Sequence, residues 1–130
     1  MDGVIFVEPT AISAMAPRQE GGLLVASRRG FGFFDLRYGS LKWMAGVEMG
    51  DRMNDGAGDH IGRFLAGTTA FNRKSSAGLC RLQTDSAVYL VLSNASPPNG
   101  IYCAPNDQTM RHVDTPTRQI AAFSYEFFTA

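Results

Sequence analysis

Arg52-Met-Asn-Asp-Gly-Ala-Gly-Asp-His-Ile-Gly-Arg-Phe-Leu-Ala-Gly-Thr68 is the segment from which the architecture of this chain can be predicted. It opens with polar side chains that could bind a metal ion or a sugar: Arg52, Asn54 and Asp55. Glycines follow between Gly56 and Gly62, and their conformational freedom indicates a turn. The apolar residues 63–69 come next and have the length of a short strand. The segment therefore predicts a polar loop that leads directly into a β-strand.

Short apolar runs of the same kind recur along the chain, and Gly, Asn, Asp or Pro bounds each of them. The expected strands are 22–27, 32–36, 41–45, 63–69, 78–82, 87–92, 100–104, 109–114 and 119–125. Three segments align because each is a polar turn followed by an apolar strand: 19–27, 60–68 and 106–114. Their starts lie roughly 40 to 46 residues apart, which is the repeat length of four-stranded propeller blades. We therefore predict an all-β fold with blade-like repeats at about 9–50, 51–96 and 97–130.

The composition suits one modest globular domain and argues against several classes of function. The chain has 130 residues, of which 45% are hydrophobic and 18% are charged. Lys and Arg number 12 and Asp and Glu number 12, so the formal net charge is 12 − 12 = 0, which disfavours binding to nucleic acid. No apolar run approaches the length of a membrane-spanning helix, and the N-terminus lacks a signal-peptide pattern. We expect a cytoplasmic protein that does not bind membranes.

Asn54 and Asn99 lie one repeat apart, since 99 − 54 = 45. Residues one repeat apart occupy equivalent positions in neighbouring blades, and the ends of the innermost strands converge on the central channel of a propeller. We therefore expect both amides to face one axial site. Asn-Asp-Gly and Asn-Gly are also common turn sequences when considered alone. Asp55 either belongs to this site or caps the turn that follows it.

The segment 52–68 resembles the signature R-x-N-D-G-x-x-D-x-x-G-R-[FW]-x-A-G-T of the gluconolactonase/regucalcin (senescence marker protein) family of lactone hydrolases. The resemblance extends from about Pro9 to the end of the chain. Further matching segments are Ala77-Gly-Leu-Cys-Arg-Leu82, Asn99-Gly-Ile101, Val113-Asp-Thr-Pro-Thr-Arg118 and Ala122-Phe-Ser-Tyr125. The family is a six-bladed β-propeller. The resemblance thus implies about three of its blades here: a half-propeller that is a truncated product, a fragment or one part of an assembly.

The resemblance also implies a function, which is the hydrolysis of a sugar lactone with the help of a divalent metal ion on the propeller axis. Calcium is the metal commonly found in the family, and zinc, manganese or magnesium are alternatives. Asn99 matches the asparagine whose side-chain oxygen binds the metal, and a neutral amide oxygen suits a hard cation. Arg52 and Asn54 match residues that bind the sugar lactone. The metal would polarise the lactone carbonyl, and a carboxylate would act as general base.

Two metal-binding turns of the family are absent from this sequence. One carries a Glu in a G-E-G-P-like turn, and the other carries an Asp, which is also the candidate general base, in a P-D-G turn. Glu8-Pro9 stands at the wrong place in the repeat to be the first, and Asn106-Asp107 is a turn that leads into a strand. Asn72 stands where some members have an acidic substrate contact. The resemblance therefore assigns Asn99 as the metal ligand of this chain and leaves its catalytic residue unknown.

Other residues that could carry chemistry have structural interpretations. Asp59 is expected to close the turn after the polar segment. Cys80 and Cys103 form no metal-binding pair and are expected to be small buried residues, with a disulfide or a reactive thiol as the alternative. His60 is expected in a solvated turn. His112 lies within an expected strand without a second ligand at metal-binding spacing, so a structural role is expected.

Two classes of function remain open. The first is a metal-dependent hydrolase of sugar lactones that is incomplete in this chain. The second is a non-catalytic module derived from a propeller, which keeps part of the sugar pocket and binds a ligand or a partner. Three blades leave the flanks of a propeller uncovered, so two chains could also associate through these open edges and close a ring.

Overall fold

The computed structural model describes residues 11–44, 52–69, 77–95, 97–106 and 108–125. All regular structure in these residues is β-strand. The strands are β1 (Ile12–Pro17), β2 (Leu23–Ser27), β3 (Gly30–Asp35), β4 (Ser40–Trp43), β5 (Arg52–Gly58), β6 (Phe64–Thr69), β7 (Ala77–Leu82), β8 (Val88–Ala95), β9 (Asn99–Cys103), β10 (Thr109–Asp114) and β11 (Gln119–Ser124). Among the described residues there is no helix that could cross a membrane.

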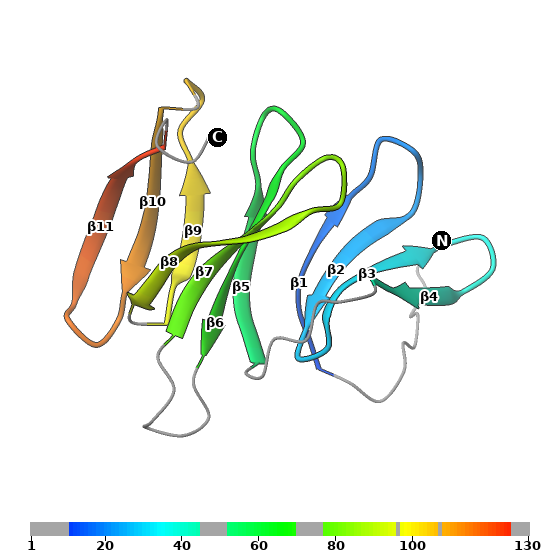
Figure 1. The fold of residues 1–130 in the computed structure, drawn as a ribbon, viewed down its shortest axis with the longest axis horizontal. Helices are drawn as coiled ribbons and strands as arrows, with labels where there is room; N and C mark the ends of the chain where they lie inside the picture. Colours follow the sequence, from blue (N-terminus) through cyan, green and yellow to red (C-terminus); the bar gives the residue numbers. More distant parts are fainter. Residues whose placement is uncertain (1–10, 45–51, 70–76, 96, 107, 126–130) are drawn as a thin grey trace, which may run out of the picture.

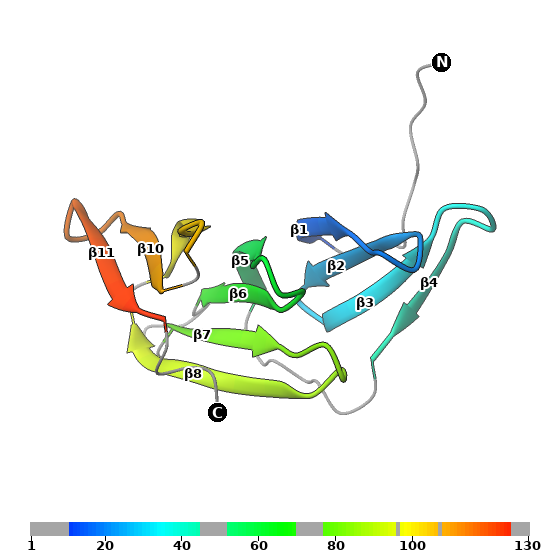
Figure 2. The same cartoon turned by 90° about the horizontal axis from the view of Figure 1, so that it is seen from above.

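The strands form three antiparallel sheets, and each sheet consists of strands that follow one another along the chain. β1–β4 make the first sheet, β5–β8 the second and β9–β11 the third, side by side in chain order (Figure 1). The first strands of neighbouring sheets are in contact, β1 with β5 and β5 with β9. Figure 2 shows these strands on the inner side of an arc and β4, β8 and β11 on its outer side. This is the arrangement of neighbouring propeller blades, and it confirms the predicted all-β fold.

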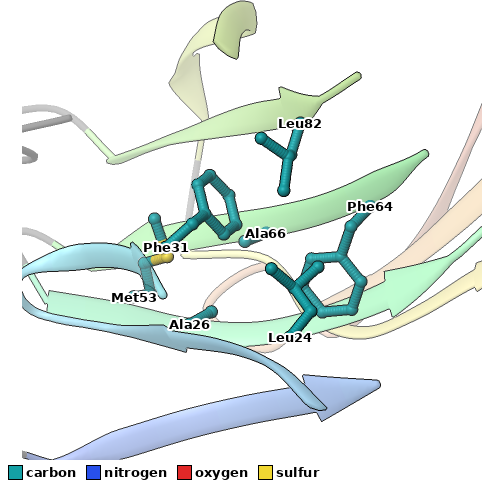
Figure 3. Packing of buried hydrophobic residues seen from close by; sticks show 7 residues of the cluster. All are labelled: Leu24, Ala26, Phe31, Met53, Phe64, Ala66 and Leu82. Carbon is teal, nitrogen blue, oxygen red and sulfur yellow. The ribbon is translucent and has the colours of Figure 1, made fainter. Parts of the chain in front are cut away.

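Apolar side chains pack between the first and second sheets. The cluster consists of Leu24, Ala26, Phe31, Met53, Phe64, Ala66 and Leu82, all buried. Figure 3 shows these side chains meeting from the two sheets. The rings of Phe31 and Phe64 meet edge to face with their centroids 6.2 Å apart, a favourable geometry for two aromatic rings. The first sheet therefore buries its apolar face against the second.

A second cluster joins the second sheet to the third. Its buried members are Leu65, Leu79, Ile101, Cys103, Met110 and Tyr125. Successive residues of a strand point to opposite faces, so Phe64 belongs to the first cluster and its neighbour Leu65 to the second. The second sheet is thus apolar on both faces, as a sheet between two others must be.

β1 and β5 correct the sequence-based prediction, which has no strand at either place. β5 runs through Gly56, where the glycines indicated a turn. The reason is close packing, because a Cβ on Gly56 would lie 2.7 Å from the ring of Phe64 and 2.8 Å from the carbonyl oxygen of Leu65. Asn54 consequently lies within a strand and not in a loop before one. The nine predicted strands each overlap one of the other observed strands, although Ala45 lies outside the described residues.

Candidate functional site

Asn54 and Asn99 occupy equivalent positions in neighbouring sheets. Gly58 is the last paired residue of β5 and Cys103 is the last paired residue of β9. Asn54 and Asn99 stand at the same distance from these residues, since 58 − 54 = 4 and 103 − 99 = 4. The two asparagines therefore lie at the same end of adjacent inner strands, as the repeat spacing predicts.

A hydrogen bond connects these two positions. Nδ2 of Asn54 donates to the main-chain carbonyl of Pro98 over 3.1 Å, and Pro98 directly precedes Asn99. Oδ1 of Asn99 accepts a hydrogen bond from the amide of Gly100 over 3.1 Å. These bonds place the site at the junction of the second and third sheets. Asn54 is half-buried and Asn99 is exposed, so the site is open to solvent.

Arg52 is the first residue of β5, and its side chain is exposed. The backbone at this residue is held in place, because the hydroxyl of Thr69 donates to the carbonyl of Arg52 over 3.1 Å. Met53, between Arg52 and Asn54, is fully buried in the first cluster. The buried Met53 thus lies between Arg52 and Asn54, the two residues that match sugar-binding positions of the family.

Asp55 joins the inner strands beside the site. Its Oδ2 accepts a hydrogen bond from the amide of Ile101 in β9 over 3.1 Å. Its Oδ1 accepts one from the amide of Gly56 over 2.8 Å. The carboxylate therefore links β5 to β9, and it does not cap the turn between β5 and β6.

Asp59 closes the turn between β5 and β6, as the sequence predicts. Its carboxylate accepts hydrogen bonds from the main-chain amides of Ile61 at 3.1 Å and Arg63 at 2.8 Å. It also accepts from Nε of Arg63 at 2.5 Å and from the hydroxyl of Tyr125 at 2.7 Å. Burial by itself raises the pKa of Asp59, but the hydrogen bonds from Tyr125 and Arg63 outweigh burial and hold this pKa below its ordinary value. The cluster fastens the second sheet to the third at the end opposite to Asn54.

The described residues do not fit a complete calcium site. Calcium takes about six to eight oxygen ligands, usually with several carboxylates among them. Within the described ranges, no three His, Cys, Asp or Glu side chains come together in a way that could hold a metal ion. Two described carboxylates lie at the same end of the sheets as Asn99. Asp55 accepts hydrogen bonds from two main-chain amides, and Asp114 accepts one from the amide of Thr117 over 3.3 Å. Glu8, Asn72 and Asp107 lie outside the described residues.

Ser13 is a polar residue of the inner strands that the sequence reasoning missed. It lies in β1, is half-buried, and its hydroxyl donates to the main-chain carbonyl of Met53 in β5. Pro17 is the last paired residue of β1, and 17 − 13 = 4, so Ser13 stands where Asn54 stands in the next sheet. The interval 54 − 13 = 41 matches the repeat length. This spacing could have identified Ser13 from the sequence if a strand had been predicted at β1.

The structural interpretations of the cysteines are confirmed, because Cys80 and Cys103 are both buried and no disulfide joins them. Burial raises the pKa of the Cys80 thiol to about 11. His112 is buried and stacks on Phe123, with ring centroids 5.4 Å apart. His60 is exposed in the turn after β5. These residues lie outside the candidate site.

Comparison with known proteins gives the family. The model described as SMP-30/Gluconolactonase/LRE-like region matches residues 2–129 of the chain. The chain belongs to this family. Its membership confirms the resemblance based on residues 52–68, and it accounts for the three blade-like sheets.

Individual relatives agree with this assignment. Regucalcin from Danio rerio is 30% identical over 123 residues, which cover 91% of this chain and 42% of the relative. A 6-deoxy-6-sulfogluconolactonase from Pseudomonas putida is 30% identical over 112 residues, covering 83% of this chain and 38% of the relative. The crystal structure of regucalcin from Agrobacterium tumefaciens, described as a calcium-binding protein, matches with a TM-score of 0.74 and 25% identity, covering 89% of this chain and 40% of that one. The chain thus spans about two fifths of the length of these proteins.

Proposed function

We propose that this chain forms the sugar-binding part of a hydrolase of sugar lactones. The observation that carries the proposal is the hydrogen bond from Asn54 to the carbonyl of Pro98. This bond holds the candidate sugar-binding residue beside the candidate metal ligand, Asn99. The substrate class is supported by the family description, which includes gluconolactonase, and by a relative named 6-deoxy-6-sulfogluconolactonase.

Arg52 and Asn54 offer hydrogen-bonding groups that suit a ring with many hydroxyls. The guanidinium of Arg52 presents several N–H donors in a fixed fork, and it is exposed where a ligand can approach from solvent. Asn54 uses one N–H for Pro98, so its Oδ1 and its second N–H are available for sugar hydroxyls. Because one N–H is already held, the ligand meets an amide whose plane is preorganised.

Hydrolysis would need a general base and, as the resemblance to the family implies, a metal site. The described carboxylates at this end are engaged elsewhere. Asp55 and Asp114 both accept hydrogen bonds from main-chain amides. We therefore assign lactone binding to the described residues. Hydrolysis would take place where additional carboxylates complete a metal site that includes Asn99, with calcium as the preferred cation.

A non-catalytic binding module is the second candidate. It is favoured because the carboxylates of Asp55 and Asp114 accept hydrogen bonds from main-chain amides and are thus used to hold the fold. Such a module would keep the sugar site of Arg52 and Asn54 without turning the lactone over. The two candidates therefore share the binding step and differ in hydrolysis.

Self-association through the outward face of the third sheet is a further part of the proposal. The equivalent face of the first two sheets is buried by the next sheet, through Leu24, Ala26, Phe31, Leu65 and Leu79. On the third sheet this face carries exposed apolar side chains: Tyr102 at 53%, Val113 at 38% and Ile120 at 72%. Ile120 pairs with Val113 as Phe31 pairs with Ala26, so the positions correspond. We propose that a sheet of a second copy covers this face.

Isothermal titration calorimetry with 1,5-anhydroglucitol, a cyclic polyol that cannot hydrolyse, tests the sugar site. We expect Asn54→Ala to weaken binding about tenfold, because the substitution removes both the acceptor and the donor that the amide offers to the sugar. Gln19→Ala is the control, because Gln19 is an exposed amide in the turn at the opposite end of the first sheet. Equal affinity of Asn54→Ala and the unmodified chain would contradict the proposal.

Acid release from gluconolactone in a pH-stat separates the two candidates. Turnover above the spontaneous rate with Ca²⁺, abolished by chelator and by Asn99→Ala, would identify a hydrolase. Sugar binding without turnover would identify the binding module.

A further inference from the structure

One kind of hydrogen bond links the inner strands in succession. The hydroxyl of Ser13 in β1 donates to the main-chain carbonyl of Met53 in β5. Nδ2 of Asn54 in β5 donates to the main-chain carbonyl of Pro98 over 3.1 Å. Met53 directly precedes Asn54, and Pro98 directly precedes Asn99. Each donor therefore holds the residue before the next polar residue, and the links run from Ser13 to Asn54 to Asn99.

The two donor strands depart from regular pairing where their donors lie. In β1 the register against β2 shifts between Ile12 and Ala14, which flank Ser13. In β5 the register against β6 shifts between Met53 and Gly56, and Asn54 lies between them. Such β-bulges redirect a side chain and are frequent beside active sites. The irregular pairing lets these side chains reach the neighbouring sheet.

We propose that Ser13 is a positioning residue for the sugar site and acts on it through Asn54. The proposal rests on the proposed function, which assigns Asn54 to the sugar and Asn99 to a metal. By holding the carbonyl of Met53, Ser13 fixes the backbone that carries Asn54. Asn54 has a second role beside sugar contact, because its amide fixes the backbone that carries Asn99.

The acceptors dictate the chemistry of both donors. Each acceptor is a main-chain carbonyl, so each side chain must supply a donor: Ser13 supplies its O–H and Asn54 supplies an N–H. Ser13→Ala removes the hydroxyl, whereas Ser13→Thr keeps it. Asn54→Asp keeps the shape of the side chain and replaces the donor by an acceptor oxygen. The three variants therefore separate loss of the donor from loss of bulk.

Exchange of side-chain amide protons, measured by NMR in the absence of ligand, tests these links. We expect Ser13→Ala to shift the side-chain amide resonances of Asn54 and to speed their exchange roughly fivefold, the equivalent of one net hydrogen bond. Ser13→Thr should stay within about twofold of the unmodified chain. Ser124→Ala, at an exposed serine of β11, is the control and should leave Asn54 unchanged. Unchanged resonances and exchange of Asn54 in Ser13→Ala would overturn the proposal.

Asn54→Asp tests the second link independently of the folding of the Ser13 variants. We expect it to shift the side-chain amide resonances of Asn99, because Pro98 loses its donor. Resonances of Asn99 that do not move would overturn the link from Asn54 to Asn99.

The affinity for sugar, measured by calorimetry, tests whether these hydrogen bonds position the sugar site. We expect Ser13→Ala to weaken binding of 1,5-anhydroglucitol roughly fivefold, in step with the exchange result, and Ser13→Thr to restore it. Unaltered affinity despite faster exchange would overturn the positioning role. An unmodified chain that does not bind the sugar would refute the proposed function, and the exchange data would still decide whether the links exist.

Discussion

The side-chain amide of Asn54 donates a hydrogen bond to the main-chain carbonyl of Pro98, although the two residues lie 44 positions apart. The bond crosses from the second sheet to the third. Packing also holds Pro98 there, because a Cβ on Gly67 would lie 2.8 Å from Cβ of Pro98. The position of Asn99, the next residue, is therefore set by a hydrogen bond and by close packing against the second sheet.

Gly67→Ala should displace Pro98 and loosen this junction. Its new Cβ would meet three atoms of the Pro98 ring at 2.8 to 3.0 Å, closer than carbon atoms pack. We expect a loss of about 1–3 kcal/mol in the free energy of unfolding, which is typical of overpacking. Urea denaturation measures the loss. Gly58→Ala is the matched control, because the nearest atom to its new Cβ lies at 3.9 Å; equal losses in both variants would refute this explanation.

Asp59 should make the stability of the protein depend on acid pH. Its pKa is lowered in the folded state from an ordinary value of 3.8, since hydrogen bonds from Tyr125 and Arg63 outweigh the effect of burial. The stabilisation is therefore fully present at pH values above the unfolded pKa, and it is lost as the pH falls through the folded pKa. Urea denaturation from neutral pH down to about pH 2.5 measures this dependence.

Asp59→Asn is the comparison that isolates this carboxyl. At neutral pH the variant should be less stable than the unmodified chain, and the difference should shrink as the pH falls below 3.8. Two stability curves that run parallel down to acid pH would show that Asp59 does not act in this way.

Cys80 should resist alkylation while the protein is folded. The side chain is buried, and burial raises its pKa to about 11, so little thiolate forms at pH 8. Mass spectrometry after treatment with iodoacetamide should find Cys80 unmodified in the native protein and modified in urea. Rapid native modification at this residue would contradict the packing of β7.

The sequence predicts β2 and β6 better than the inner strands β1 and β5 beside them, and the reason is physical. β2 and β6 are runs of apolar residues. Leu24 and Ala26 of β2 are buried in the first cluster, and residues 64–66 of β6 alternate between the two clusters. β5 contains Asn54, Asp55 and two glycines, which disfavour strands in isolation. Its strand conformation comes from neighbours on both sides: β6 in its own sheet, and Pro98 and β9 in or beside the next one. Such contacts between sheets cannot be read from a local pattern.

The candidate site could be predicted in part, because some of its residues follow the sequence repeat. The spacing of Asn54 and Asn99 follows the repeat, so their equivalence could be read from the sequence. Ser13 was not predicted because its strand was not predicted. No sequence pattern around it indicates that its hydroxyl bonds to Met53. The structural use of Asp55 could not be anticipated either, since its partner, Ile101, belongs to another sheet.

Ile120→Lys should weaken self-association. Ile120 is 72% exposed on the face of the third sheet that corresponds to buried faces of the other two. A lysine there would place a charge in the proposed contact between copies, where it would have to lose its hydration. Multi-angle light scattering should show a lower molar mass than for the unmodified chain. Ile61→Lys, at an exposed residue in the turn after β5, should leave the mass unchanged; a monomeric unmodified chain would contradict the proposed association.

The location of the sugar site is tested by following main-chain amide resonances in an NMR titration with 1,5-anhydroglucitol. We predict that the shifted resonances gather at the start of β5, around Arg52 and Asn54, and at the start of β9, around Asn99. The turn at Asp59, at the opposite end of the sheets, should not respond. Shifts that gather at that opposite end, or no shifts at millimolar sugar, would contradict a sugar site at the junction of the second and third sheets.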